Sequence, residues 1–423
     1  MLQARFTRVS LFFVSLFFVS LMCVVSCHDV TAPVPAVLTQ LPRALTISET
    51  SVRDASTAFS FALWAKVNAA QPDANVFISP LSASFALGMT MNGAATVTYD
   101  QMRGALQFGN SSLADINAGY RSLIALLTSL DPGVKMQIAN SIWYRNGFPV
   151  LQTFVDTTRT YFDATVKGLN FADVQGSLAT INGWVNSATN GKIPSVLDGI
   201  DPSEMMFLIN AIYFKGSWRS QFDPAQTTAA TFTTSTGATQ QMQLMRQLHA
   251  FSYAETAAYQ AVDLPYGDSA FTMTVLLPKA GTDIQTLAAS LTPTAWQSLI
   301  GSLRAVEHVD LSLPKLTLAY KRQLKPDLMA LGMVEPFDSN GADFTRMAPN
   351  PAGSQLFIEF VQQNSFVDIN EEGTEAAAVT TVGVGTVSAP LVTVMRVDRP
   401  YIMVIRERLT GTVLFMGKVV RMP

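Results

Sequence analysis

The first third of the chain, beyond its N-terminal segment, carries apolar residues at helical spacing. The pattern predicts an amphipathic helix over residues 51–70 and another over residues 113–130. Between them, the apolar run 76–78 predicts a short strand that ends at Ser79. Serine is a favoured N-cap and the following Pro80 suits the first helical turn, so we predict a further helix from Pro80 onward. That helix should be buried, because few polar residues interrupt it.

Beyond residue 136 the pattern changes to short apolar runs that are typical of strands. Helices are predicted among them at 181–189 and 323–331. The strand-like runs are 137–144, 205–213, 261–264, 271–277, 309–313, 357–369, 401–405 and 413–420. Because helices and strands neither alternate regularly nor repeat at a fixed period, the pattern predicts an α+β fold with large antiparallel or mixed sheets.

The N-terminal segment has the pattern of an export signal. Arg5 and Arg8 precede an uncharged apolar stretch at 9–26, as in a secretory signal peptide. The length of this stretch also allows a transmembrane helix that stays in place as an anchor. Residues 24–27, Val-Val-Ser-Cys, resemble the bacterial lipobox, in which the cysteine is diacylated. We therefore predict lipidation of Cys27, with an uncleaved anchor or ordinary secretion as alternatives.

The chain accordingly divides into three predicted parts: a signal peptide at 1–26, a flexible tether at 27–46 and one folded domain at 47–423. The tether contains prolines and no amphipathic period. No linker interrupts the folded domain. These features predict an exported protein that is held at the cell envelope or cell surface as a lipoprotein, or that is extracellular if it is not lipidated.

Composition excludes several classes of function. Lys and Arg total 28 against 31 Asp and Glu, giving a formal net charge of −3, and no clustered cations indicate a nucleic-acid partner. Removing residues 1–26 takes away two arginines and no acidic residue, which changes the charge from −3 to −5. The only cysteines are Cys23 and Cys27, so the folded body can hold neither a disulfide nor a thiolate metal site. The three histidines are scattered without partners at ligand spacing, so we predict no metal and no cofactor.

Residues 376–395 form an uncharged stretch near the C-terminus. Its length would allow a transmembrane helix, but its threonine, glycine, serine and proline residues favour an extended chain. Just before it, Gly373 is followed mainly by residues with small side chains. A segment needs this composition if it must hinge and then slide between two existing strands.

Residues 370–380, Asn-Glu-Glu-Gly-Thr-Glu-Ala-Ala-Ala-Val-Thr, closely resemble the hinge of the serpin family of serine protease inhibitors. Further matches to the family occur in the family's order at 75–82, 210–218, 398–401 and 414–419. The resemblance covers about residues 50–423. It implies the serpin fold: an α+β domain with a large central mixed sheet, further sheets, about eight or nine helices and an exposed reactive centre loop over about 371–399.

The resemblance also implies a suicide-substrate mechanism. A protease accepts the loop as a substrate and forms an acyl-enzyme, and the cleaved loop then enters the main sheet as a new strand, which distorts the attached protease. The native state is therefore expected to be metastable. The implied hinge comprises Glu371, Glu372, Gly373, Thr374, Glu375, Ala376, Ala377 and Ala378. Among residues 374–379, which would enter the sheet first, Thr374 is small and the alanines at 376–378 raise no steric objection, which favours inhibition over simple cleavage.

Counting from the hinge with the loop length usual in the family places the reactive bond at Val387–Ser388. Because the segment from Ser388 to Pro400 is longer than in familiar mammalian relatives, Thr386–Val387 and Ser388–Ala389 remain alternatives. Small aliphatic residues suit the shallow primary pocket of an elastase-like or subtilisin-like protease. The absence of Lys and Arg from the uncharged stretch argues against a trypsin-like target.

The resemblance assigns support of the opening sheet to Ser79, Ser82, Asn210, Trp218 and Gln363. Many members of the family have a histidine at the last of these positions, where it hydrogen-bonds with the asparagine that corresponds to Asn210. Glutamine can also donate and accept, so we expect Gln363 to preserve this interaction without pH sensitivity.

We thus predict a monomer that is not an enzyme and has no catalytic residue. Its expected partners are a target serine protease, in a covalent complex, and a membrane through the lipid on Cys27. The alternative is a non-inhibitory binding or chaperone-like protein of the same fold, which bulky or charged hinge residues would have favoured. A serine hydrolase is a third hypothesis, but no nucleophile-elbow pattern occurs in the sequence.

Overall fold

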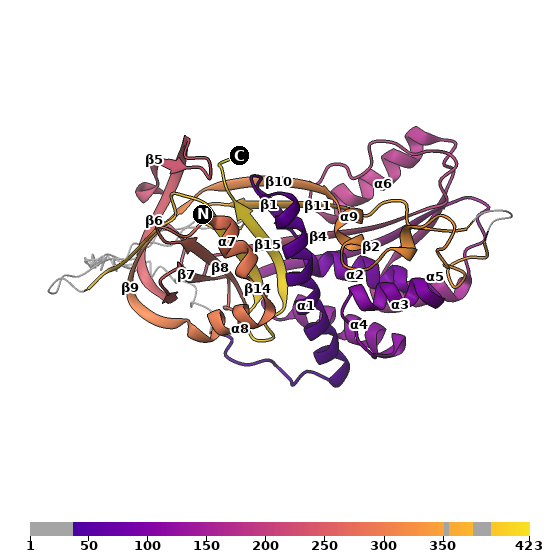
Figure 1. The fold of residues 1–423 in the computed structure, drawn as a ribbon, viewed down its shortest axis with the longest axis horizontal. Helices are drawn as coiled ribbons and strands as arrows, with labels where there is room; N and C mark the ends of the chain where they lie inside the picture. The colour runs from indigo at the N-terminus through magenta and orange to yellow at the C-terminus, as the bar shows by residue number, and fades with distance from the viewer. Residues whose placement is uncertain (1–36, 351–354, 375–390) are drawn as a thin grey trace, which may run out of the picture. The chain divides into compact units, whose positions relative to one another are not determined.

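The computed structural model describes residues 37–350, 355–374 and 391–423. Helices dominate the first third of these residues and strands dominate the rest (Figure 1). The helices are α1 (Ile47–Ala70), α2 (Pro80–Met91), α3 (Thr96–Ala105), α4 (Leu113–Ser129), α5 (Gln152–Phe162), α6 (Val174–Ala188), α7 (Ile284–Ser290), α8 (Pro293–Ser302) and α9 (Lys325–Met329), with short 3-10 turns η1 (Pro224–Gln226) and η2 (Glu335–Phe337). None of the described helices is both long enough and apolar enough to cross a membrane.

The candidate site is built on a six-stranded sheet. In spatial order its strands are β10 (Leu316–Gln323), β11 (Gln362–Ile369), β12 (Gly373–Thr374), β4 (Met206–Ser217), β2 (Val134–Arg145) and β3 (Thr165–Leu169). Strands β2 and β3 are parallel, whereas the other neighbouring pairs are antiparallel. The sheet is therefore mixed, as the sequence predicts.

A nine-stranded sheet contains most of the strands of the C-terminal half. Its path is β1 (Val76–Ile78), β15 (Val413–Val419), β14 (Tyr401–Glu407), β8 (Phe271–Pro278), β7 (Tyr259–Pro265), β6 (Thr239–Glu255), β9 (Arg304–Pro314) and β13 (Thr393–Arg396), with β5 (Thr228–Thr233) paired to β6. Strand β13 runs parallel to β9 at the edge of this sheet. The segment that follows the hinge in sequence thus rejoins the described chain just before β13.

At β4 the six-stranded sheet packs on both faces, because β4 sends alternate side chains to opposite sides. Phe207 and Ile209 pack in a small core with Ile181 and Val185 of α6. Leu208, by contrast, packs against the large core of the domain. Figure 1 shows α6 on one side of this sheet and α2 on the other. Any segment added beside β4 would therefore have its side chains directed into two different cores.

The start of α2 forms as its sequence predicts. Ser79 is the N-cap, its Oγ accepts a hydrogen bond from the Ser82 amide at 3.4 Å, and Pro80 occupies the first turn. Nearly every side chain of α2 is buried. The predicted helices at 51–70 and 113–130 correspond to α1 and α4.

The predicted strand at 357–369 is partly wrong, because pairing begins only at Gln362. Residues 355–361 are irregular. Their apolar side chains contact the two cores from the edge of a cavity, and Phe360 packs against the ring of Phe207 at 6.0 Å between centroids. Apolar character in this segment therefore reflects side-chain packing and not a backbone ladder.

Residues 37–46, at the end of the predicted tether, contact the folded domain. The amide of Leu38 donates to the carbonyl of Asp268 at 2.8 Å. Arg43 pairs with Glu49 in the first turn of α1 at 2.5 Å, and Thr46 caps that helix through a capping box with Glu49. Because a carboxylate that receives these bonds is stabilised in its charged form, the hydrogen bond from Arg43 lowers the pKa of Glu49 to about 2.

Candidate functional site

The two residues of β12 lie between β11 and β4 at one end of the six-stranded sheet. Gly373 pairs with Ser217 and Thr374 pairs with Gly216 of β4. On the other side Thr374 pairs with Ile369 of β11. In the described part of the chain, β11 and β4 do not pair with each other, and only β12 pairs with both of them. Among the described residues, therefore, no other ladder joins the two halves of the sheet.

Gly373 occupies a position that only glycine fits. Its φ of +154° is a conformation that side chains disfavour. A Cβ atom there would lie 2.2 Å from the carbonyl oxygen of Gly216 and 2.7 Å from the Cα of Ser217. The missing side chain allows the chain after β11 to turn and press directly against the backbone of β4.

Thr374 is buried beneath two aromatic rings. Its Oγ1 lies 2.7 Å from the hydroxyl of Tyr266, whose ring stacks on Trp218 with the centroids 4.5 Å apart. The indole Nε1 of Trp218 donates to the carbonyl of Asn370 at 2.9 Å. Burial raises the pKa of Tyr266 far above its ordinary value, so its phenol stays protonated. These contacts hold both the turn before β12 and the threonine at its end.

Glu371 ties the turn to a neighbouring part of the domain. Its Oε2 lies 2.7 Å from the Nζ of Lys315, and its Oε1 accepts from the Thr227 hydroxyl at 2.8 Å. Burial acts to raise the pKa of Glu371, but the hydrogen bonds from Lys315, the backbone and Thr227 outweigh it, so the pKa is lowered overall. Next in the chain, the carbonyl of Glu372 accepts from the backbone amide of Trp218 at 2.8 Å.

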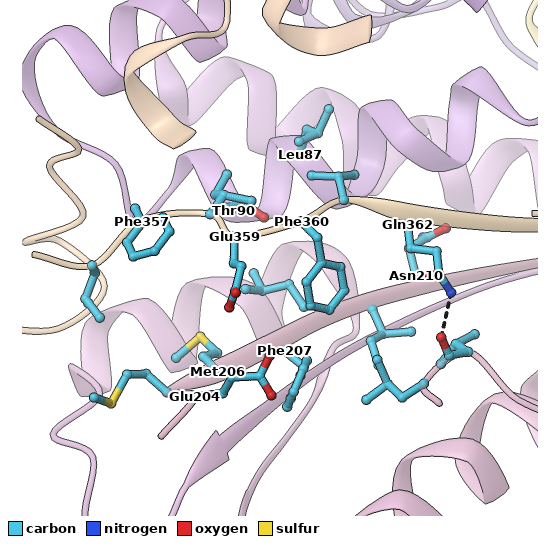
Figure 2. Close-up of a pocket in the computed structure, with 18 of the residues that line it drawn as sticks. Leu87, Thr90, Glu204, Met206, Phe207, Asn210, Phe357, Glu359, Phe360 and Gln362 are labelled. Carbon is cyan, nitrogen blue, oxygen red and sulfur yellow. Dashed lines mark hydrogen bonds between the residues drawn. The ribbon is translucent and has the colours of Figure 1, made fainter. Parts of the chain in front are cut away.

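A cavity of about 420 Å³ lies where β4 and the segment leading into β11 face each other without pairing. One wall is formed by residues 203–211 and the other by residues 355–362. In Figure 2, Phe207 and Phe360 lie close together from opposite walls, and Asn210 and Gln362 lie further along. The sheet thus has an opening whose length continues the line of β12.

A polar cluster lies along this opening. Ser82 Oγ donates to Asn210 Oδ1, and Asn210 Nδ2 donates to Asn140 Oδ1 on β2 at 2.7 Å. Ser79 Oγ donates to the carbonyl of Leu414 at 2.8 Å. The structure therefore brings Asn210 to Ser79 and Ser82, which lie far from it in the sequence.

The prediction that Gln363 hydrogen-bonds with Asn210 is wrong. Its Nε2 donates to the carbonyl of Ser79 at 2.7 Å and its Oε1 accepts from the Ser79 amide at 3.1 Å, whereas the described bonds of Asn210 go to Ser82 and Asn140. The difference follows from the opening, because β11 and β4 do not pair and Gln363 turns to the start of α2 instead. Gln363 still links β11 to α2, and amides do not titrate near neutral pH.

Several predicted residues fall outside the described part of the chain. These are Cys27, the hinge residues Glu375, Ala376, Ala377 and Ala378, and the reactive-bond residues Val387 and Ser388. Glu371, Glu372, Gly373 and Thr374 lie together at β12 as described above.

Sequence reasoning missed Tyr266, Lys315, Thr227 and Asn140 as partners of the predicted residues. Asn140 had a detectable signal, because an amide in the middle of the apolar run 137–144 needs a hydrogen-bond partner. For Tyr266, Lys315 and Thr227 the sequence holds no such signal, because their roles depend on the tertiary packing around the turn.

Comparison with known proteins places this geometry in context. The family model described as "Serpin (serine protease inhibitor)" matches residues 54–422. Neuroserpin of Gallus gallus is 32% identical over 364 residues, covering 84% of this chain and 88% of the relative. The solved structure of the thermophilic serpin tengpin in its native state has a TM-score of 0.80 at 28% identity, covering 92% of this chain and 97% of the other. A complex of thyroxine-binding globulin with thyroxine has a TM-score of 0.79 at 26% identity, covering 87% and 98%.

The family model spans most of the chain, and the two solved structures cover 92% and 87% of it. Members of this family are typically protease inhibitors rather than catalysts. The α+β fold with its mixed central sheet agrees with the predicted fold class. The chain belongs to the serpin family.

Proposed function

We propose that this protein inhibits serine endopeptidases by trapping them after they cleave the loop between β12 and β13. The observation that carries the proposal is the position of β12. Gly373 and Thr374 already form the first rungs of a strand between β11 and β4, and the space ahead of them holds no ladder in the described residues. A cleaved loop can extend this strand by continuing along the same line.

The existing register predicts where each loop residue would go in the inserted state. Thr374 pairs with Gly216 and with Ile369, so an unbroken antiparallel continuation brings Thr380 opposite both Asn210 and Gln363. Thr380 would thereby meet the polar cluster, where its hydroxyl can find partners.

The next positions match the two faces of the sheet. In the same register Val382 falls between Leu208 and Val361, which pack against the large core. Gly383 falls between Phe207 and Phe360, whose rings are 6.0 Å apart on the α6 side. An apolar residue thus faces the apolar core, and a residue without a side chain meets the close aromatic pair. This agreement between the loop sequence and the opening supports insertion as the mechanism.

The proposed reactive bond is Val387–Ser388, with Thr386–Val387 and Ser388–Ala389 as alternatives. Its aliphatic residues favour an elastase-like or subtilisin-like target. The proposed inhibitor is a monomer until it forms a covalent complex with the protease.

We also propose that the protein is exported and tethered to the cell envelope by a lipid on Cys27. Support comes from the sequence of the leader, in which an uncharged apolar stretch ends at a lipobox-like motif. Metabolic labelling with a fatty-acid analogue tests this: the intact chain should become labelled and a Cys27→Ser variant should not. Equal labelling of both would contradict lipidation at this residue.

Incubating the chain with neutrophil-type elastase, subtilisin, chymotrypsin, trypsin and papain tests the inhibitory function. Denaturing gels would show which protease forms a covalent complex, and mass spectrometry of the released C-terminal fragment would identify the cleaved bond. We expect a complex with elastase or subtilisin and a fragment that begins at Ser388 or an adjacent residue. Clean cleavage without a complex for every protease would favour the non-inhibitory binding protein.

A further inference from the structure

The cavity in the opening of the sheet has a lining that loop insertion alone does not explain. Its walls carry the aromatic rings of Phe148, Phe207, Phe357 and Phe360 together with aliphatic side chains. Its volume of about 420 Å³ is within the range that holds a small organic ligand. Phe357 is 41% exposed, so the cavity reaches the surface on that side.

Two carboxylates face this apolar space. Figure 2 shows the side chains of Glu204 and Glu359 directed into the cavity from opposite walls, beside Phe207 and Phe360. In the part of the chain that the structure describes, neither carboxylate forms an ion pair with a basic side chain. Lys325 lies nearby, but its Nζ donates to the backbone carbonyl of Glu359 at 3.2 Å. The cavity therefore holds two carboxylates that are not paired directly with a described cation, and the Glu359 side chain is exposed.

The amide of Gln355 adds a further acceptor. Its Oε1 is buried at the cavity wall and has no hydrogen-bond partner among the described residues. Burial, together with the negative charge of Glu359, raises the pKa of Glu204 despite a hydrogen bond from the Asp201 amide. A bound cation would reduce the electrostatic repulsion between Glu204 and Glu359. An N–H group on that cation could also donate a hydrogen bond to the unpaired Oε1 of Gln355.

We propose that this cavity binds a small organic ammonium ion with an apolar aryl or alkyl body. The ammonium group would lie between Glu204 and Glu359, where aromatic faces can also attract a cation. The apolar body would fill the space beside the Phe207–Phe360 pair, toward Phe357 (Figure 2). A bare metal ion fits less well, because the remainder of the lining offers rings and aliphatic groups instead of oxygen ligands.

The chain's own loop is the competing occupant, since residues 381–384 would pass through the same space after cleavage. Residues 376–395 carry no charge, so the loop cannot neutralise Glu204 and Glu359. A bound ammonium ion would therefore oppose completion of the inserted strand and divert the inhibitor toward simple cleavage. This consequence rests on the proposed function, whereas binding itself does not.

Calorimetric titration of residues 28–423 with 4-phenylbutylamine at neutral pH tests the site. Its neutral analogue 4-phenylbutan-1-ol and its anionic analogue 4-phenylbutanoate serve as ligand controls. We expect saturable binding of the amine, at least about tenfold tighter than that of the alcohol. The Glu204→Gln, Glu359→Gln double variant should lose this preference, and Glu307→Gln, at an exposed position on β9, should retain it. Hydrogen exchange should slow at 204–209 and 355–362 when the amine binds.

Absence of saturable amine binding, equal affinity for the alcohol, or an undiminished preference in the double variant would overturn the proposal. Competition by Ca²⁺ at stoichiometric concentration would also overturn it, by identifying a metal site. Adding the amine to a protease reaction then tests the consequence: the fraction of loop cleaved without a complex should rise. If the amine binds but no protease is ever trapped, the inhibitory function fails while the ligand site stands.

Discussion

At the scale of single residues, Gly373 has no room for a side chain. A Cβ atom there would overlap the Gly216 carbonyl and the Ser217 Cα of β4. We expect Gly373→Ala to push β12 off the sheet and to delay insertion, so that more inhibitor is cleaved per protease trapped, by about tenfold or more. Titrating a fixed amount of protease with each protein measures this stoichiometry. Gly301→Ala on α8, where a Cβ meets nothing, is the matched control and should behave like the original chain.

The ion pair of Glu371 with Lys315 gives a second prediction. Because Lys315 is 40% exposed, the pair should be worth only about 0.2–1 kcal/mol in a double-mutant cycle of Glu371→Gln and Lys315→Met. The pKa of Glu371 is lowered in the folded state, so its contribution is present above the ordinary carboxyl pKa and is lost as pH falls through the lowered value. Unfolding midpoints measured from pH 7 down to pH 3 should therefore converge for the original chain and Glu371→Gln. A gap that stays constant to pH 3 would contradict this account.

The sequence allowed the residues of the turn to be predicted, but not the side chains that bond to them. Gly373 and Thr374 could be singled out because a hinge needs small residues, and Glu371 because the segment resembles the serpin hinge. Tyr266 and Lys315 could not, because strand pairing and packing bring them to the turn from elsewhere in the chain. Gln363 bonds to the helix start at Ser79 and not to Asn210, the partner expected from the resemblance.

At the scale of elements, the opening between β4 and β11 makes a prediction about the loop sequence. If Gly383 enters between Phe207 and Phe360, a branched side chain there must separate two rings that are 6.0 Å apart. We expect Gly383→Val to leave the rate of loop cleavage unchanged and to raise the number of inhibitors consumed per trapped protease severalfold. Thr381→Val, a change of nearly constant volume on the same face of the inserted strand, should have little effect. Equal behaviour of both variants would mean that the register is different.

Helices and strands whose apolar residues recur at a regular spacing could be predicted from the sequence. Elements that form through contacts with neighbouring strands or helices could not. Helices α1, α2 and α4 and strand β1 follow from apolar spacing and from the cap at Ser79. Strand β6 (Thr239–Glu255) was missed, because its long polar sequence becomes a strand through pairing with β5, β7 and β9. Helices α3 and α5 were also missed, because few of their residues are apolar. Tertiary contacts decide such segments.

At the scale of the whole molecule, the proposal requires a native state that is less stable than the cleaved one. Insertion would add hydrogen bonds on both sides of a new strand, each worth about 0.5–1.5 kcal/mol net. For a domain of this size, where each kcal/mol shifts the Tm by only about 1 °C, a gain of several kcal/mol should raise the Tm by several degrees. Circular dichroism before and after loop cleavage by a protease that is not trapped measures the change. An unchanged Tm would mean that the cleaved loop stays outside the sheet.

The central claim is that a protease is trapped because the cleaved loop becomes a strand between β4 and β11. The most direct measurement compares the original chain with Thr374→Arg against elastase on a denaturing gel. Thr374 is 4% exposed and bonded to Tyr266, and a buried unpaired charge at this position should block insertion. The account predicts a covalent complex for the original chain and, for Thr374→Arg, cleavage at the same bond without a complex. An undiminished complex with Thr374→Arg would contradict it.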